Sequence, residues 1–259
     1  MRPWRMVRAR CQRWWSRWFG QVEAGQAEDR PDENRGDEAG ATAGQVVFRA
    51  DFGSARQWVA GRTSAYPRMG PTNRGDHKLD HLVDRYCPDG RFTASRRTDG
   101  LWDCNLLTTE GSLDAFQVRT GDTLDARVTL PTGLGAWPAI WTWRGGGNEV
   151  DAFEYHPDNP SLLELSNNVR GGHSYWTDPT GAVAPGATVD LRVVLGARSV
   201  VWYVNGVRVF ADGRGVGTAW SAYLIVNLSV SDGTYHPRPG PGQNDPLSWT
   251  CHSLSVTRP

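Results

Sequence analysis

Beyond residue 44 the chain consists of short apolar runs in which hydrophobic and polar positions alternate, and turn residues separate these runs. In residues 123–130 every second position is apolar, and the run ends at Pro131. This period of two is typical of a β-strand with one buried face. Residues 222–230 are apolar on both parities, which indicates a strand that is covered on both sides.

The same pattern predicts about ten strands, and no helix-period segment of useful length follows residue 20. The expected ranges are 46–52, 84–97, 101–109, 123–130, 136–143, 149–155, 162–169, 189–195, 199–210, 222–230 and 249–256. Within 199–210, Asn205-Gly206 favours a two-residue hairpin turn. Strands without helices predict an all-β fold, a two-sheet β-sandwich of jelly-roll type.

Composition narrows the class of protein. The chain has 259 residues, with 30 Gly, 16 Pro and 13 Trp, which suits many short strands joined by turns in one domain of residues 45–259. The formal net charge of zero argues against a nucleic-acid partner. No run of about 18 apolar residues occurs, so we expect no transmembrane segment. We also expect a monomer.

Four cysteines are present, Cys11, Cys87, Cys104 and Cys251. The first lies in the N-terminal tail, and the other three lie in the body of the chain. A Cys87–Cys104 disulfide and buried free thiols are both compatible with the sequence.

The first 44 residues differ in kind from the rest. Residues 1–19 are rich in Arg and Trp at helical spacing, so a basic helix in contact with a membrane surface is one interpretation. An unstructured tail, or a start codon assigned too early, explains the same residues. Arg13 and Arg17 interrupt any apolar core, so the segment does not read as a secretory signal. Residues 20–44, mostly Glu, Asp, Gly and Ala, are expected to form a disordered linker.

The candidate chemistry lies in residues 135–154. Three tryptophans of one parity are followed by a run of glycines and then by three carboxylates, Glu149, Asp151 and Glu154. Carboxylates in an apolar strand are costly to bury, and three together repel one another. This cost indicates a functional site. A calcium site or a merely solvated acidic strand is the alternative, although calcium ligands usually come from loops.

The spacing of the three acids is irregular for a strand. Alternate residues share a face, so Glu149 and Asp151 lie together and Phe153, not Glu154, should be next. Glu154 joins the first two only if one extra residue is inserted at Ala152–Phe153. Such a β-bulge is common beside active sites. We therefore predict a bulge here if the three acids act together.

The types of residue fit the hydrolysis of a glycosidic bond with retention. That reaction needs two carboxyl groups about 5–5.5 Å apart, one as nucleophile and one as acid/base. Two long Glu side chains could approach each other, with the shorter Asp151 between them. Asp151 would share a proton with the nucleophile and raise the pKa of the neighbouring acid through like-charge repulsion.

Two segments carry a family resemblance. Residues 135–141, Gly-Ala-Trp-Pro-Ala-Ile-Trp, and residues 149–155, Glu-Val-Asp-Ala-Phe-Glu-Tyr, resemble the signature of glycoside hydrolase family 16. The two residues before the last Glu resemble the laminarinase-like (endo-β-1,3-glucanase) and agarase/carrageenase branches. Residues 200–209 and 223–230 are similar to further family segments. The resemblance covers roughly residues 45–259 and implies a concanavalin A-like jelly roll with an open substrate cleft.

The resemblance also implies the roles of individual residues. Glu149 would be the nucleophile, Asp151 the assisting acid and Glu154 the acid/base of a double displacement. Trp137 and Trp141 match the signature and would stack on sugar rings, the alternative being that they are ordinary core residues.

Further substrate contacts are implied after the next strand, at Asn168, Arg170 and His173. Many family members carry a His shortly after this strand. In this chain the aligned position is Arg170, and His173 follows three residues later in what reads as a loop.

Some members of the family bind a structural calcium ion through an Asp near each end of the domain. Asp51 could match the first of these, but the second position reads Cys251-His252-Ser253 and lacks an acid. We therefore expect no bound metal and no cofactor.

The expected function is that of a retaining endo-glycosidase on a β-linked polysaccharide, with β-1,3- or β-1,3-1,4-glucan the leading substrate. The alternatives are a transglycosylase, a non-catalytic lectin-like protein on the same scaffold, and a surface protein displayed through the tail. Three clustered acids favour an enzyme over a binding module. The resemblance implies an extracellular location, although no signal peptide is readable.

Overall fold

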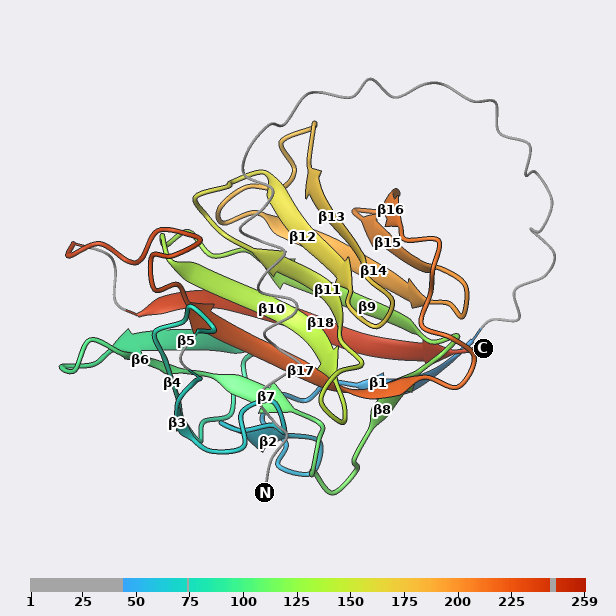
Figure 1. Cartoon of the computed structure of the whole chain (residues 1–259), viewed down its shortest axis with the longest axis horizontal. Helices are drawn as coiled ribbons and strands as arrows, with labels where there is room; N and C mark the ends of the chain where they lie inside the picture. Colours follow the sequence, from blue (N-terminus) through green and yellow to red (C-terminus); the bar gives the residue numbers. More distant parts are fainter. Residues whose placement is uncertain (1–43, 74, 243–245) are drawn as a thin grey trace. The chain divides into compact units, whose positions relative to one another are not determined.

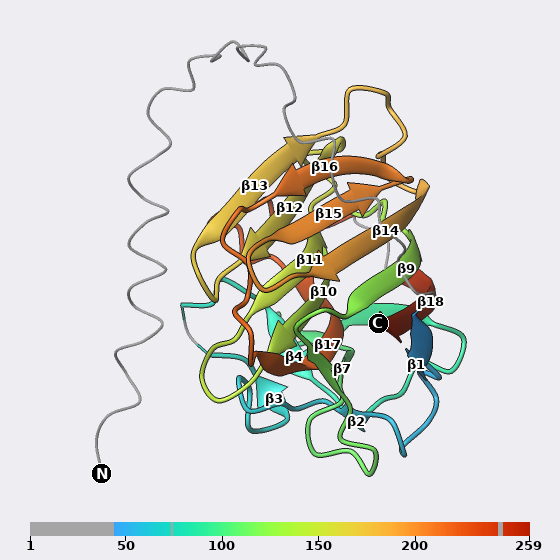
Figure 2. The same ribbon diagram turned by 90° about the vertical axis from the view of Figure 1, so that its right-hand side faces the viewer.

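The computed structural model describes residues 44–73, 75–242 and 246–259. This part of the chain contains eighteen strands and no helix, and the strands form two sheets that pack face to face (Figures 1 and 2). The all-β jelly-roll prediction is therefore confirmed. The predictions for the Arg/Trp-rich tail and for the linker up to residue 43 lie outside the described residues. In the described part, no helix is long and apolar enough to cross a membrane.

The ten-stranded sheet forms one layer. Its order is β16 (Val207–Ala211), β15 (Val200–Val204), β14 (Thr188–Leu195), β9 (Thr123–Thr129), β18 (Leu247–Arg258), β5 (Arg91–Arg96), β6 (Trp102–Cys104), β4 (Asp80–Leu82) and β3 (Gly70–Pro71), with β1 (Gln45–Arg49) paired to β18. Every pair in this sheet is antiparallel except β4–β6.

The eight-stranded sheet carries the predicted carboxylates. Its order is β13 (Gly172–Thr177), β12 (Leu162–Asn167), β11 (Val150–Tyr155), β10 (Ala136–Trp143), β17 (Ser221–Val230), β7 (Leu106–Thr108) and β2 (Val59–Ala60), with β8 (Gln117–Arg119) paired to β17. β11 thus lies inside the sheet, between β10 and β12, so hydrogen bonds hold its backbone on both sides.

The core lies between the sheets and is rich in aromatic side chains. Ile140 of β10 and Phe153 of β11 face each other in register and are completely buried. Phe153 also makes an edge-to-face contact with Trp249 of the other sheet, with ring centroids 5.6 Å apart. Complete burial of such a side chain contributes about 1.5–3 kcal/mol. Four tryptophans, Trp58, Trp102, Trp202 and Trp249, are at most 2% exposed and therefore belong to the core.

The predicted hairpin is confirmed. β15 and β16 pair across Asn205-Gly206, which have φ angles of 49° and 79°. Two positive φ values in succession are the requirement of a type I′ turn, whose twist matches that of the strands it joins.

The prediction of one strand at 101–109 was wrong, because the chain changes sheet at Asn105. β6 belongs to the ten-stranded sheet and β7 to the eight-stranded sheet. The buried Asn105 amide accepts the Thr93 N–H at 2.9 Å and donates to the Arg85 carbonyl at 2.9 Å, so its side chain replaces part of the interrupted ladder. Because the chain crosses from one sheet to the other here, residues 101–109 have buried apolar side chains at both odd and even positions.

Other predicted boundaries also differ. The strand expected at 84–97 is confined to β5, and the strand expected at 46–52 ends at Arg49. The strands β2, β3, β4, β8 and β13 were not predicted. The first four have only two or three residues, too few to show a period.

The three described cysteines, Cys87, Cys104 and Cys251, are buried free thiols, so the structure does not contain the Cys87–Cys104 disulfide. Burial raises the pKa of the Cys87 thiol to about 12, which keeps it protonated and unreactive at neutral pH.

Candidate active site

The predicted β-bulge is present in β11. Asp151 lies opposite Trp141 of β10, whereas Glu154 lies opposite Ala139. Three steps along β11 thus match two steps along β10, and the register to β12 shifts at the same point. The extra residue is Ala152. Phe153 can therefore remain in the core while Asp151 and Glu154 share the opposite face.

A hydrogen bond across the core holds the bulge in place. Trp202 of β15, on the other sheet, donates its indole N–H to the Asp151 carbonyl at 3.0 Å. Both residues are buried, so water cannot easily replace the Trp202 donor at this carbonyl. The ten-stranded sheet thereby fixes the backbone that carries the acids.

We expect Trp202→Phe to lower both stability and activity. The loss of a buried hydrogen bond costs about 0.5–1.5 kcal/mol, and a shift of the bulge would reduce kcat by up to about 100-fold. Urea unfolding and kcat measure the two effects. Trp249→Phe is the matched control, because the Trp249 indole N–H has no hydrogen-bond partner. Equal losses in both variants would contradict the role of the Trp202 bond.

Asp151 is the most enclosed of the three acids. It is 5% exposed, and its carboxylate accepts hydrogen bonds from the Ser166 hydroxyl and, at 3.3 Å, from the Asn168 amide. Burial, together with the charges of Glu149 and Glu154, raises its pKa well above the ordinary value. The raised pKa favours the protonated carboxyl, which can donate a hydrogen bond.

Glu154 has the properties of a general acid and base. Its Oε1 accepts the Trp137 indole N–H at 2.9 Å. Burial raises its pKa to about 7, with further contributions from Glu164 and Glu149, whereas Lys78 and the Trp137 bond lower it. A pKa near neutrality lets one group donate a proton in one step and accept it in the next.

Glu149 immediately precedes β11 and is partly buried. Its backbone carbonyl accepts the Asn168 N–H at 2.9 Å, which ties it to the end of β12. Its charge acts on the pKa values of both Asp151 and Glu154, so the three predicted acids form one electrostatic cluster.

Sequence reasoning missed a fourth carboxylate, Glu164 of β12. It lies directly opposite Glu154 in the β11–β12 ladder and is the largest charged influence on the pKa of Glu154. Its neighbours Leu163 and Leu165 are buried, so alternation already placed Glu164 on the face opposite to the core. Only the pairing with a bulged β11 shows that this face is the one that carries the acids.

We expect Glu164→Gln to move the alkaline limb of the pH profile of kcat/KM to lower pH. Removal of a neighbouring negative charge lowers the pKa of Glu154, by an amount on the order of one unit, and only protonated Glu154 can act as the acid. Asp190→Asn is the control, because Asp190 is an exposed carboxylate on the other sheet. An unchanged limb in Glu164→Gln would contradict the coupling.

Lys78 was also missed, and it changes the interpretation of Trp137. Its ammonium lies 4.5 Å from the Trp137 ring centroid, and His156 lies 4.8 Å from the same ring. Burial alone would lower the pKa of Lys78, but the acidic groups around it, Tyr66 first, raise it, so Lys78 stays charged. Trp137 thus orients Glu154, and its stacking on a sugar stays a prediction.

Trp141 is buried, at 7% exposure, and donates its indole N–H to the Asn227 amide at 2.8 Å. It lies opposite Asp151 in the β10–β11 ladder and makes an edge-to-face contact with Trp143, with ring centroids 6.1 Å apart. The structure therefore gives it a packing role beside the acids. Sugar contact by Trp141 stays a prediction.

The three residues predicted after β12 lie in different places. Asn168 contacts Asp151, and His173 lies opposite Ser166, which is itself opposite Asp151. His173 belongs to β13, so its expected placement in a loop was wrong, because residues 172–177 pair with β12. Arg170 is exposed, with its guanidinium against Gly217.

The positions implied for calcium do not fit that ion. The Asp51 carboxylate accepts the Gly53 N–H at 3.0 Å in its own turn. The C-terminal strand offers a protonated thiol at Cys251 and an imidazole at His252, which contacts Thr129 at 2.7 Å. Calcium prefers several carboxylate and carbonyl oxygens. The expected absence of a cofactor stays a prediction.

The fold and the cluster together define a structural class: a jelly roll in which a strand inside one sheet carries clustered carboxylates on either side of a β-bulge. No family model matches the chain. By sequence it is 23% identical, over 195 residues, to the endo-1,3-1,4-beta-glycanase EglC of Rhizobium meliloti (strain 1021). The match covers 63% of this chain and 40% of EglC, so the chain spans about two fifths of the length of that curated relative.

Solved structures show the same fold. The endo-beta-1,3-glucanase from Pyrococcus furiosus superposes with a TM-score of 0.66 at 19% identity, covering 83% of this chain and 94% of that one. The laminarinase catalytic domain from Thermotoga petrophila RKU-1 gives 0.66 at 19%, covering 83% and 98%. The endo-1,3-beta-glucanase from Streptomyces sioyaensis gives 0.65 at 16%, covering 85% and 99%. At these identities the superpositions show that the chain shares the fold of these glucanases.

Proposed function

We propose that this chain is a retaining endo-glycosidase that hydrolyses a β-linked polysaccharide, most readily a β-1,3- or β-1,3-1,4-glucan. The observation that carries the proposal is the bulge in β11, which puts Asp151 and Glu154 on one face behind Glu149, with the pKa of Glu154 held at about 7. The endo-1,3-glucanase structures and the β-glycanase relative support the substrate class.

In the first step, the Glu149 carboxylate attacks the anomeric carbon and forms a glycosyl ester. The bond from that carbon to the leaving oxygen breaks, and the Glu154 proton passes to this oxygen. The step fits the protonation states in the cluster, because Glu154 is about half protonated at neutral pH. The raised pKa of Asp151 favours its protonated form, which can donate a hydrogen bond and adds no third negative charge to the cluster.

In the second step, Glu154 removes a proton from water, whose oxygen attacks the anomeric carbon. The ester bond breaks, and Glu149 leaves as a carboxylate. Two inversions at one carbon retain its configuration. Transfer of the glycosyl group to a sugar hydroxyl in place of water would make the same chain a transglycosylase.

The test is a panel of laminarin, lichenan, agarose and carrageenan, with reducing ends as the measure of hydrolysis. We expect release from laminarin or lichenan, and proton NMR should show the β-anomer as the initial product. Redistribution of chain lengths without new reducing ends would indicate a transglycosylase. Binding of a polysaccharide with neither new reducing ends nor redistributed chain lengths would contradict the proposed enzymatic activity and indicate a lectin-like protein.

A further inference from the structure

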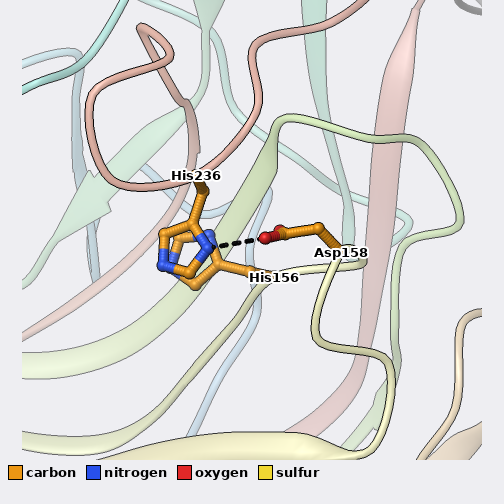
Figure 3. A group of neighbouring side chains, drawn as sticks. All are labelled: His156, Asp158 and His236. Atoms are coloured by element: carbon orange, nitrogen blue, oxygen red, sulfur yellow. Dashed lines mark hydrogen bonds and ion pairs between the residues drawn. The ribbon is translucent and has the colours of Figure 1, made fainter. Parts of the chain in front are cut away.

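Two histidines and an aspartate form a cluster next to Trp137, whose ring lies 4.8 Å from that of His156. His156 and Asp158 follow β11, and His236 follows β17, so the group joins two loops that are far apart in the sequence (Figure 3). The two imidazole rings are stacked 3.5 Å apart, and His236 Nδ1 lies 3.0 Å from Asp158 Oδ2. The ligand atoms of the three residues lie within 4.8 Å of one another.

The group contains buried polar atoms that have no partner. His156 is 3% exposed, yet its Nδ1 makes no hydrogen bond, and the same is true of Asp158 Oδ1. An unsatisfied buried polar atom costs about 1–3 kcal/mol and calls for a water or an ion. Two such atoms on neighbouring side chains indicate that something binds between them.

The other ring nitrogens face a second carboxylate. Glu164 Oε1 lies 3.8 Å from His156 Nε2 and 3.6 Å from His236 Nε2. For His156, the carboxylate beside Nε2 favours the proton there and leaves the lone pair on Nδ1, as it does around metal-binding histidines. His236 has a carboxylate beside each ring nitrogen, so its Nδ1 must give up the hydrogen bond to Asp158 when it binds a metal.

From this arrangement we infer that His156, Asp158 and His236 form a binding site for a divalent transition-metal ion of the zinc type. Two imidazole nitrogens and one carboxylate oxygen are a donor set for Zn²⁺, Ni²⁺ or Cu²⁺, whereas Mg²⁺ and Ca²⁺ prefer oxygen alone. The inference does not depend on the proposed enzymatic function. It departs from our expectation of no metal, because two of the ligands are 78 residues apart in the sequence.

Binding requires a small rearrangement. The rings are parallel to within 6°, so their lone pairs run alongside each other, and one ring must tilt to direct both at one ion. Ligand atoms bound tetrahedrally to one Zn²⁺ at about 2.1 Å lie about 3.4 Å apart. The three ligand atoms, which now lie within 4.8 Å of one another, therefore close in by up to about 1.4 Å. The ion would then clip the loop after β11 to the loop after β17.

The test is a calorimetric titration of the metal-free full chain with ZnCl₂, together with thermal unfolding. All proteins carry Cys11→Ser, so that this thiol contributes no ligand. We expect one Zn²⁺ per chain and a rise in the unfolding temperature with Zn²⁺ concentration, because an ion that binds only the folded state stabilises it. Ca²⁺ should produce neither effect.

The variants decide whether this cluster is the site. His236→Asn and Asp158→Asn should each weaken Zn²⁺ binding by roughly 10- to 100-fold or more. His252→Asn, at an exposed position of β18, should leave the binding unchanged. Asp158→Asn keeps the shape of the side chain, so it serves if His236→Asn does not fold. Absence of Zn²⁺ binding, equal binding of Ca²⁺, or full binding by both cluster variants would overturn the inference.

Discussion

Replacement of Glu149 by glutamine is expected to abolish hydrolysis and leave the fold intact. An amide cannot form the glycosyl ester, so kcat should fall by roughly 10⁴-fold or more, as it does when other catalytic nucleophiles are removed. Asp151 is a poor substitute, because burial raises its pKa and so disfavours the carboxylate form that a nucleophile needs. Reducing-sugar release from the best substrate of the panel measures the effect.

The stability of this variant should remain at least that of the native chain. The Glu149 charge raises the pKa values of Asp151 and Glu154, so its removal relieves repulsion in the cluster. Binding of the polysaccharide should survive, as shown by affinity electrophoresis. Asp190→Asn again controls for the loss of any carboxylate.

A chemical rescue sharpens the assignment. In Glu149→Ala the truncated side chain leaves space for azide, which would attack the same face of the sugar and give a glycosyl azide of inverted configuration.

Activity above about one tenth of the native value in Glu149→Gln would contradict the role of Glu149, because such a loss corresponds to only about 1.4 kcal/mol of transition-state stabilisation.

The cluster of acids was predictable because its evidence is local. Strand alternation and the spacing Glu-x-Asp-x-x-Glu leave one residue too many for a regular strand, and the register shows the bulge where this count requires it. The hairpin at Asn205-Gly206 was predictable for the same reason, since two adjacent residues define the turn. In both cases the information lies within a few residues of the feature.

The surroundings of the acids were not predictable, because they come from distant segments. Lys78 lies on the segment before β4, and Trp202 approaches from the other sheet. The residues that neighbour Lys78 or Trp202 in the sequence do not indicate that either side chain contacts β10 or β11. Glu164 is an intermediate case, because alternation gives its face but not its partner.

The expected strand at 101–109 shows a different limit. Apolar residues on both parities indicate burial on two sides, which a strand within one sheet and a chain that crosses between sheets satisfy equally. Asn105, between the buried Cys104 and Leu106, is itself buried, and its amide bonds to Arg85 and Thr93 mark the crossing. A buried polar residue inside such a run is therefore a signal for a change of sheet.

Replacement of Glu154 by glutamine is expected to reduce hydrolysis of the polysaccharide by about 10²–10⁴-fold, the usual contribution of general acid–base catalysis. The loss should depend on the leaving group. A dinitrophenyl β-glucoside oligomer needs no proton to leave, so its first step should proceed nearly at the native rate, and a burst of dinitrophenol should precede slow turnover. Equal losses on both substrates would contradict the role of Glu154 as the acid.

The pH dependence of the same variant tests the assignment independently. The pKa of Glu154 is raised to about 7, so native kcat/KM should fall as pH rises through 7, where the acid loses its proton, and Glu154→Gln should lack this limb.

A raised carboxyl pKa also favours folding at low pH, and this contribution is lost as pH rises from the ordinary value of about 4.3 to 7. The glutamine variant has no such contribution to lose. Its free energy of unfolding, measured with a chelator present, should therefore rise relative to that of the native chain as pH increases from about 4.3 to 7. A constant difference between the two proteins would mean that Glu154 titrates in the folded chain as it does in water, and the acid would then have to be sought elsewhere in the cleft.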